Sequence, residues 1–120
     1  MSVYTIHYAY TKPPLSLNQR QEWYVKSKLT RMLRDATRIK SRDIPPLGRC
    51  RVTLTWFVVT KHRRDVDNII PTLKAICDGL VDGDVVEDDT PEFMEKLMPQ
   101  IVQIPASAGP ARFELRIEKI

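Results

Sequence analysis

Apolar residues at every second position predict two β-strands in the first half of the chain. Residues 3–10, "VYTIHYAY", show this alternation and are rich in β-branched and aromatic side chains. Residues 49–60, "RCRVTLTWFVVT", give the strongest pattern, because the even positions from 52 to 58 form one apolar face while Phe57 and Val59 add apolar surface to the other. A strand that is apolar on both faces belongs near the middle of a sheet.

Apolar residues at helical spacing predict two main helices, over residues 19–38 and 69–81. In the first helix one apolar stripe runs from Val25 to Ala36, and basic residues lie along a different side. In the second helix Pro71 suits the first turn, where no backbone N–H is needed. Cap and turn residues bound this second helix: Asp67 or Asn68 at its start, and Gly79 and Gly83 at its end.

The last third of the chain predicts a short third helix and a hairpin. Residues 90–98, "TPEFMEKLM", carry a helix-start pattern, with Thr90 as the cap and Pro91 at the first helical position. Residues 100–105 and 111–120 predict two strands that form a hairpin around "ASAG". The inward side chains of the second strand are expected to be Phe113, Leu115 and Ile117. The whole pattern predicts one α+β domain over residues 1–120, in which the two main helices pack on a mixed β-sheet.

Composition is typical of a globular domain and sets several other classes aside. The 120 residues are 42% hydrophobic and 28% charged. No apolar run approaches the roughly 18 residues of a membrane span, and the start of the chain lacks a secretory pattern, so we expect a cytoplasmic protein with no membrane partner. Cys50 and Cys77 form no CxxC pair and are expected to be reduced, buried thiols. His7 and His62 are isolated in the sequence, which argues against a zinc site.

The net charge of +4 conceals two blocks of opposite sign. Residues 20–64 hold 13 Lys or Arg and three acids, a net charge of +10. Residues 65–95 hold ten acids and one base, a net charge of −9. The basic block indicates a polyanionic partner such as nucleic acid, and the acidic block could face that partner only with a cation between them. Two ordinary solvated surfaces are the simpler interpretation of the same blocks.

The stretch "RRDVDN", residues 63–68, is the main candidate for chemistry. Side chains two residues apart in an extended strand point the same way, so Asp65 and Asp67 are expected to project together. The following helix carries the chain away, and its return delivers a second acidic group that includes Asp88 and Asp89. A simpler interpretation stays open, in which the first two aspartates only cap the helix and the second group is a solvated turn.

If the two acidic groups meet, they need protons or a cation, since two carboxylates about 4 Å apart repel by roughly 4 kcal/mol at an effective dielectric of about 20. Oxygen ligands without Cys or His favour a hard ion, Mg²⁺ or Mn²⁺. Such an ion can activate water and stabilise the leaving oxygen of a phosphodiester. The adjacent Arg63 and Arg64 carry the planar guanidinium groups that pair with phosphate. Lys74 has two interpretations, a cation near the scissile phosphate or a surface pair with Asp78 one helical turn later.

These residues resemble the RusA-type Holliday junction resolvases. That family has a basic tract running into Asp-x-Asp-Asn, then a helix with a lysine and an Asp-x-Leu ending, then an Asp-Asp pair. Here the matching segments are "RRDVDN", "LKAICDGL" and "EDD". The early "PPLSLN" resembles the family's Pro-Pro loop with its asparagine, and "RFELRIE" resembles its last strand. The resemblance runs through most of the chain and is sharp over residues 63–89.

The resemblance implies a RusA-like fold, a homodimer and metal-dependent nicking of four-way DNA junctions during recombination and repair. It implies that Asp65, Asp67 and Asp89 hold Mg²⁺, or Mn²⁺ as a substitute, with Asp88 as a fourth ligand. It also implies a catalytic role for Lys74. A two-fold dimer suits this substrate, because a junction presents two symmetric strands to cut.

The chain departs from the family's pattern in two places. Three extra residues, including Pro71, lie between Asn68 and the lysine. Three residues turn a helix by about 300°, so Lys74 stays near the same face but is displaced by almost one turn. The segment "TPEFMEKLM" is the second departure, because the family's next strand is expected sooner after the acidic pair.

The expected DNA contacts are basic side chains and one amide, and binding through them should weaken steeply with added salt. These residues are Arg63, Arg64, Lys28, Arg31, Arg34 and Arg38, with Asn18 added by the resemblance. Two other functions stay open: a nuclease on forks, flaps or single strands, and a catalytically silent junction-binding protein. An RNA-binding module ranks last, since it needs exposed aromatic platforms on a sheet and the strands show no clustered surface aromatics.

Overall fold

The structure is a computed structural model that describes residues 2–17, 20 and 22–120. Strands and helices alternate along the first two thirds of the chain, and three strands follow. In chain order the elements are β1 (Val3–Tyr8), α1 (Trp23–Lys40), β2 (Cys50–Val58), the 3-10 turn η1 (Val66–Ile69), α2 (Ile70–Asp82), β3 (Met94–Lys96), β4 (Gln100–Gln103), the 3-10 turn η2 (Ala106–Ala108) and β5 (Arg112–Lys119).

The strands form one mixed sheet in the order β1-β5-β2-β3, and β4 also pairs with β2. β5 lies antiparallel to both β1 and β2. On its other edge β2 pairs in parallel with β3 along residues 50–52 and with β4 along residues 55–58. The prediction that this strongly apolar strand lies inside the sheet is therefore confirmed.

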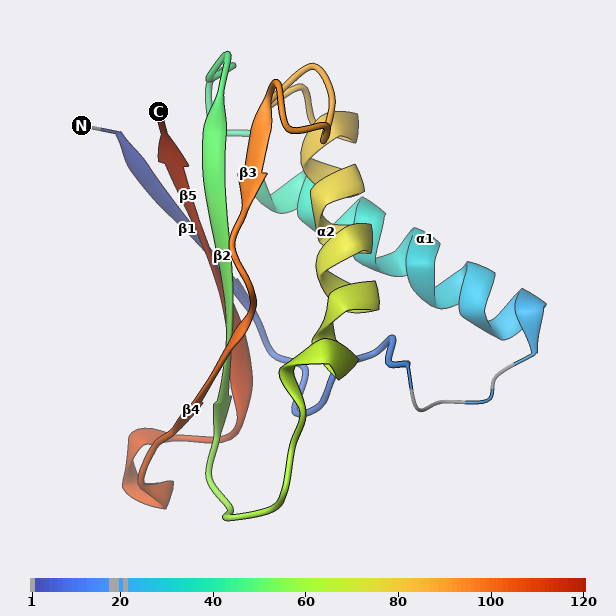
Figure 1. The fold of residues 1–120 in the computed structure, drawn as a ribbon, viewed down its shortest axis with the longest axis vertical. Coiled ribbons are helices and arrows are strands. Elements are labelled where there is room, and N and C mark those ends of the chain that lie inside the picture. The colour runs from blue at the N-terminus through green and yellow to red at the C-terminus, as the bar shows by residue number, and fades with distance from the viewer. Residues whose placement is uncertain (1, 18–19, 21) are drawn as a thin grey trace.

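Both helices cover the same face of the sheet, which makes a two-layer α+β fold (Figure 1). Val52, Leu54 and Leu115 on that face are fully buried against Leu33 of α1 and Ile76 of α2. The expected inward side chains of β5 are confirmed, because Phe113, Leu115 and Ile117 all belong to this core. Burial of these side chains is the main force that holds the helices on the sheet.

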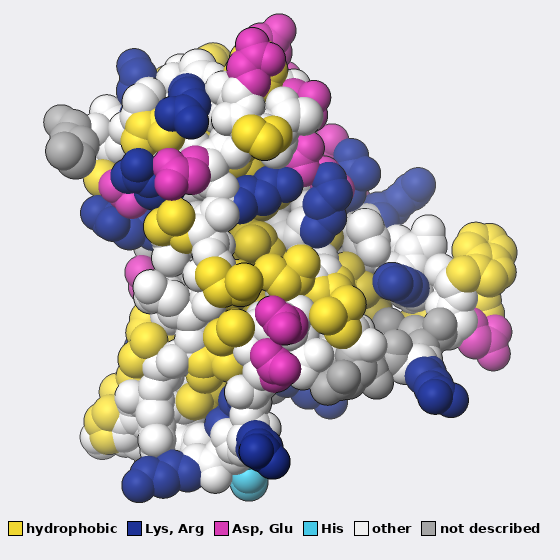
Figure 2. All heavy atoms as spheres, in the orientation of Figure 1, with side chains coloured by type: hydrophobic (Ala, Val, Ile, Leu, Met, Phe, Trp, Pro, Cys, Tyr) yellow, Lys and Arg dark blue, Asp and Glu magenta, His cyan; other side chains and the backbone are white. Residues whose placement is uncertain are grey.

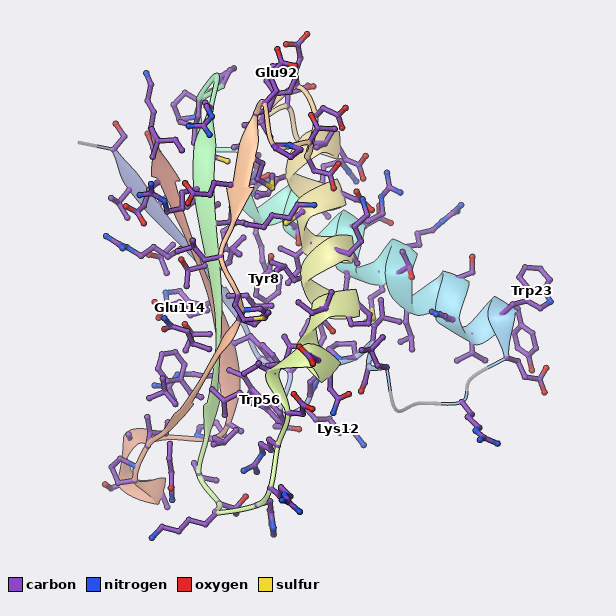
Figure 3. The ribbon with its side chains drawn as sticks, viewed as in Figure 1. Tyr8, Lys12, Trp23, Trp56, Glu92 and Glu114 are labelled. Atoms are coloured by element: carbon purple, nitrogen blue, oxygen red, sulfur yellow. The ribbon has the colours of Figure 1, made fainter. Side chains whose placement is uncertain are left out.

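The opposite face of the sheet is polar and its charges are paired. Arg51 of β2 contacts Glu95 at 2.9 Å and Glu118 at 3.9 Å, and Arg112 lies over the Phe57 ring. Glu114 points away from the helices on this side (Figure 3). The Arg112 guanidinium thus covers the Phe57 ring on this face, whereas an RNA-binding sheet needs exposed aromatic platforms.

The two helices pack closely at Gly79, which lies inside α2 and not at its end. A Cβ atom at this position would lie 2.6 Å from the Thr37 Cβ and 2.8 Å from the Arg34 carbonyl oxygen of α1. The missing side chain thus allows the close approach. Gly83 fulfils the expected role, since it follows the last helical residue and its N–H donates to the Gly79 carbonyl.

The expected cap of the second helix is wrong by two residues. Asp65 precedes η1, and its carboxylate accepts the Asp67 N–H. α2 begins directly after η1 with Ile69 at its cap position and no side-chain cap, so neither Asp67 nor Asn68 fills this role. The 3-10 turn moves the start of the helical run toward Asp65, which is the best placed acceptor. Pro71 lies in the first turn of α2, as expected.

The expected third helix is wrong. Residues 90–93 form a turn in which the Phe93 and Met94 N–H groups donate to the Thr90 carbonyl. The chain then extends as β3, because the edge of β2 supplies partners: the Cys50 N–H donates to the Phe93 carbonyl, and the Leu97 N–H donates to Val52. Pairing with a distant strand overrides the local helix-start pattern.

The expected hairpin is also wrong. β4 pairs with one edge of β2 and β5 pairs with the other, so the chain crosses the end of β2 between them. A central strand has open N–H and C=O groups on both edges, and both segments satisfy those groups instead of pairing with each other. Within the residues described, neither helix is long and apolar enough to cross a membrane.

Candidate functional site

Asp65 and Asp67 lie in the connection between β2 and α2. Asp65 has extended backbone, and its Oδ1 accepts the Asp67 N–H at 3.2 Å. This turn holds both residues at the head of the helical run, and both are exposed to solvent. This Asx-type turn starts η1 and fixes the backbone of both aspartates at one place in the chain.

A surface hollow of about 520 Å³ lies beside this turn and is lined by both signs of charge: Arg63, Arg64, Asp65, Val66 and Asn68. Arg63 is exposed. Arg64 is held by its own chain, since its guanidinium donates to the Thr60 carbonyl at 2.8 Å and to the Thr60 hydroxyl at 2.7 Å. It also lies 5.1 Å over the Trp56 ring. Of the two arginines, Arg63 is therefore the one better placed to meet a ligand.

A second cluster of charged side chains lies along α2 and joins Lys74 to two carboxylates. The Lys74 Nζ donates to Asp78 at 2.9 Å and to Asp89 at 2.7 Å. Lys96 of β3 donates to the same Asp89 oxygen at 2.8 Å. The expected surface pair with Asp78 is confirmed, and the return of the chain brings Asp89 to the same ammonium group.

The charges in this cluster fix one another. Hydrogen bonds from Lys74 and then from Lys96 hold the pKa of Asp89 far below its usual range. The bonds to Asp89 and then to Asp78 raise the pKa of Lys74. At neutral pH Asp89 is therefore a carboxylate and Lys74 an ammonium group, which suits a fixed positive charge and not a proton donor or acceptor.

The two acidic groups do not converge on one point in this structure. Asp67 and Lys74 are seven residues apart, which is two helical turns and roughly 10 Å along an α-helix. Asp65 lines the hollow described above, whereas Asp89 lines a different one with Arg49 and Lys96. In Figure 2, hydrophobic side chains separate acidic side chains near the lower end of α2 from basic side chains higher on the same face.

A three-acid metal cage is accordingly not seen: no three His, Cys, Asp or Glu side chains among the residues described are grouped so that they could hold a metal ion. The physical reason is that two ammonium groups neutralise Asp89 where it lies. Asp88 is exposed and bonds locally, since its Oδ1 accepts the Asp89 N–H at 2.8 Å. The expected set of Asp65, Asp67, Asp88 and Asp89 is thus divided into two pairs.

The first pair still has the chemistry that a magnesium site needs. Mg²⁺ is usually held by one or two carboxylates, with waters and substrate phosphate oxygens completing its shell. Asp65 and Asp67 supply two exposed carboxylates at one turn, and Asn68 is the next residue. This pair fits a Mg²⁺ ion that is shared with a phosphate, whereas Asp88 and Asp89 add no ligand in the present arrangement.

The basic residues expected on the first helix have different roles. Arg34 is paired with Asp82 of α2 through two hydrogen bonds of 2.8 Å, so it joins the two helices. Lys28, Arg31 and Arg38 are exposed and available to a partner. Asn18 lies outside the described residues.

Lys96 is a site residue that the sequence reasoning missed. It lies in β3, which was expected to be helical, and only its place in the strand beside β2 directs it to Asp89. The signal in the sequence was the run of apolar residues around it, which suits an edge strand as well as a helix.

Comparison of the chain with protein-family models and with curated proteins gave no match.

Proposed function

We propose that this protein is a metal-dependent, structure-selective endodeoxyribonuclease that nicks four-way (Holliday) DNA junctions as a homodimer. One observation carries the proposal: Asp65 and Asp67 are both exposed in one turn at the head of α2, and Asp65 lines a hollow together with Arg63. Carboxylates that can hold a metal next to a guanidinium that can hold phosphate are the parts that hydrolysis of a DNA backbone needs.

Each residue has a task in this proposal. Asp65 and Asp67 hold Mg²⁺, which when bound activates water and stabilises the leaving oxygen. Arg63 binds the phosphate and orients it against the aspartates. Lys74 adds a fixed positive charge on the same helix, and Asp89 is its positioning residue, because their 2.7 Å contact directs the flexible lysine side chain.

The exposed bases of α1 supply sequence-independent binding. Lys28, Arg31 and Arg38 contact phosphates and set the register of the DNA without reading its sequence. Four-way junctions are the proposed substrate because of the resemblance to RusA-type resolvases, and forks or flaps are the alternative branched substrates.

A second candidate, a silent junction-binding protein, is favoured by one specific observation. Asp89 is neutralised by Lys74 and Lys96, so the third acid of the expected ligand set is engaged elsewhere. A chain that keeps its basic helix but lacks a complete metal site would bind junctions without cutting them.

The two candidates separate in an assay of Asp67→Asn on a labelled synthetic junction, with Mg²⁺ and with chelator. The nuclease proposal expects about 100-fold or greater loss of nicking, with junction affinity unchanged or higher because a repulsive charge is gone. Asp84→Asn is the matched control: Asp84 is also an exposed acid, and its positive φ of 60° suits asparagine. If wild type binds junctions but yields no nicks in Mg²⁺ or Mn²⁺, the silent binder is the correct function.

A further inference from the structure

The first half of α1 extends beyond the body of the fold. The first buried residue of this helix is Leu33, ten positions after its start at Trp23. At the rise of an α-helix this is roughly 15 Å. Within that length Leu29 is half-buried and packs against the core. Figure 1 shows this end of α1 reaching past α2, away from the sheet. We call residues 23–32 the α1 arm. Among the residues described, no layer of the fold covers its outer side.

Two large aromatic side chains occupy the tip of this arm. Trp23 is 80% exposed and Tyr24 is 57% exposed. Their rings meet edge to face with centroids 6.4 Å apart. Trp23 lies at the outer end of the helix, far from the core (Figure 3). Trp56, in contrast, has contacts within the fold: its ring stacks on Phe113, and its indole N–H donates to the Thr11 carbonyl.

Positive charge continues from the tip along the same side of the helix. Tyr24, Lys28 and Arg31 stand at i, i+4 and i+7, the spacing that aligns side chains on one helical face. α1 carries six Lys or Arg and one acid, Asp35. Of these cations Arg34 is already paired with Asp82 of the same chain. The arm therefore offers two aromatic rings followed by Lys28 and Arg31, which are exposed and form no ion pair with another described residue.

This combination selects one class of partner. Aromatic rings stack on any exposed base, and a basic track beside them follows the phosphate backbone. Charge complementarity argues against a second copy of the same helix, because two arms with this excess of cations would repel each other. A fully paired duplex has no open base for the rings, so the arm fits nucleic acid with unpaired or splayed bases.

We propose that the α1 arm binds such DNA, with Trp23 and Tyr24 stacked on unpaired bases while Lys28 and Arg31 hold the adjacent phosphates. The inference rests on the proposed function only in taking DNA as the ligand. It deepens that function, since open bases occur where strands branch and the arm would favour those places over plain duplex.

The test measures binding of the intact protein to three fluorescent DNAs in chelator: oligo-dT, a four-way junction and a blunt duplex. Trp23→Ala should weaken binding to oligo-dT and the junction about tenfold, with little change for the duplex. Trp23→Phe should retain most of the affinity because a ring remains. Met98→Ala, which removes another exposed apolar side chain far along the chain, is the control and should bind like wild type.

Two further measurements separate stacking from charge. Oligo-dT should quench the fluorescence of wild type but not of Trp23→Phe, because Trp56 is covered by Phe113 and Arg64. Lys28→Ala should lower the dependence of log affinity on log salt by about one, whereas Trp23→Ala should leave it unchanged.

Three results would overturn the inference. Trp23→Ala could bind oligo-dT as tightly as wild type does, or it could lose as much affinity for the duplex as for oligo-dT. It could also change only the self-association of the protein, which would make the tip of the arm a contact between two copies. Nicking is a separate readout. If oligo-dT quenches the fluorescence but the protein never cuts, the inference about the arm stands and the nuclease proposal fails. If the protein cuts but replacing Trp23 has no effect on binding, the nuclease proposal stands and the inference about the arm fails.

Discussion

At the scale of single residues, the positions of charged side chains decide what the acidic segment can do. Asp89 is only 13% exposed and contacts two ammonium groups, whereas Asp65 and Asp67 are open to solvent. Of the three aspartates expected to hold a metal, Asp65 and Asp67 are therefore the accessible ones. Lys74 of α2 balances the charge of Asp89 and lies seven residues after Asp67, which belongs to η1.

The Asp89 cluster predicts a pH dependence of stability. Its lowered pKa means that Asp89 stabilises the fold above its unfolded pKa of about 4 and loses this contribution as the pH falls toward the lower folded value. The raised pKa of Lys74 means that its contribution is present below about pH 10.4 and is lost as the pH rises toward the folded value.

Asp89→Asn should accordingly lower the free energy of unfolding by roughly 1 kcal/mol between pH 5 and 9, a modest value because Lys74 is partly solvated. The difference from wild type should shrink below pH 4. Thermal unfolding of both proteins over this range measures it. A difference that stays constant down to pH 3 would mean that the ion pairs do not form.

At the scale of elements, the contact between α1 and α2 depends on a missing side chain. Gly79→Ala on an exposed helix would stabilise by about 1 kcal/mol through helix propensity. Here the added methyl group meets Thr37 and the Arg34 carbonyl, so the sign should reverse to a loss of roughly 1–3 kcal/mol. The midpoint of thermal unfolding should fall by roughly 4 to 12 °C.

Ser27→Ala is the control for that change, because Ser27 is an exposed position in α1 and its replacement should alter stability by no more than about 0.5 kcal/mol. A Gly79→Ala protein as stable as wild type or more stable would show that the helices do not approach closely at this point.

The length and periodicity of each element determine how well the sequence predicts it. β2 and α2 have a strong period over nine or more residues, and their type and burial follow from it. β3 has three residues and follows a helix-like "TPE", so only the open edge of β2 determines its conformation. The partners of β4 and β5 are likewise set by β2 and not by the short turn between them.

The contacts of the candidate site likewise include local ones, which the sequence can predict, and long-range ones, which it cannot. The turn at Asp65 and the pair Lys74–Asp78 are local contacts between residues two and four positions apart. In the first the Asp65 carboxylate accepts the Asp67 backbone N–H, and in the second two side chains meet at the i, i+4 spacing of a helix. The pairs Lys74–Asp89 and Arg34–Asp82 join residues 15 and 48 positions apart, and they depend on where two elements pack. The sequence therefore predicts each acidic pair but not the distance between the pairs.

At the scale of the whole molecule, charge is distributed so that one polyanion can contact several elements. The exposed bases Lys28, Arg31 and Arg38 lie on α1, and Arg63 lies in the segment that leads from β2 into η1. The helices cover one face of the sheet, and on the opposite face Arg51 is paired with Glu95. Under the proposed function, a branched DNA would contact the aromatic rings and cations of the α1 arm as well as the two aspartates at the head of α2.

The central claim is that Asp65 and Asp67 support metal-dependent cleavage of branched DNA. The most direct measurement is strand cleavage of a labelled four-way junction, beside a duplex of the same sequence, by wild type in Mg²⁺ and in chelator. The account predicts nicks at symmetric positions in two opposing strands of the junction in Mg²⁺, few in the duplex, and none in chelator. Cleavage that is equal on both DNAs, or that persists in chelator, would contradict it.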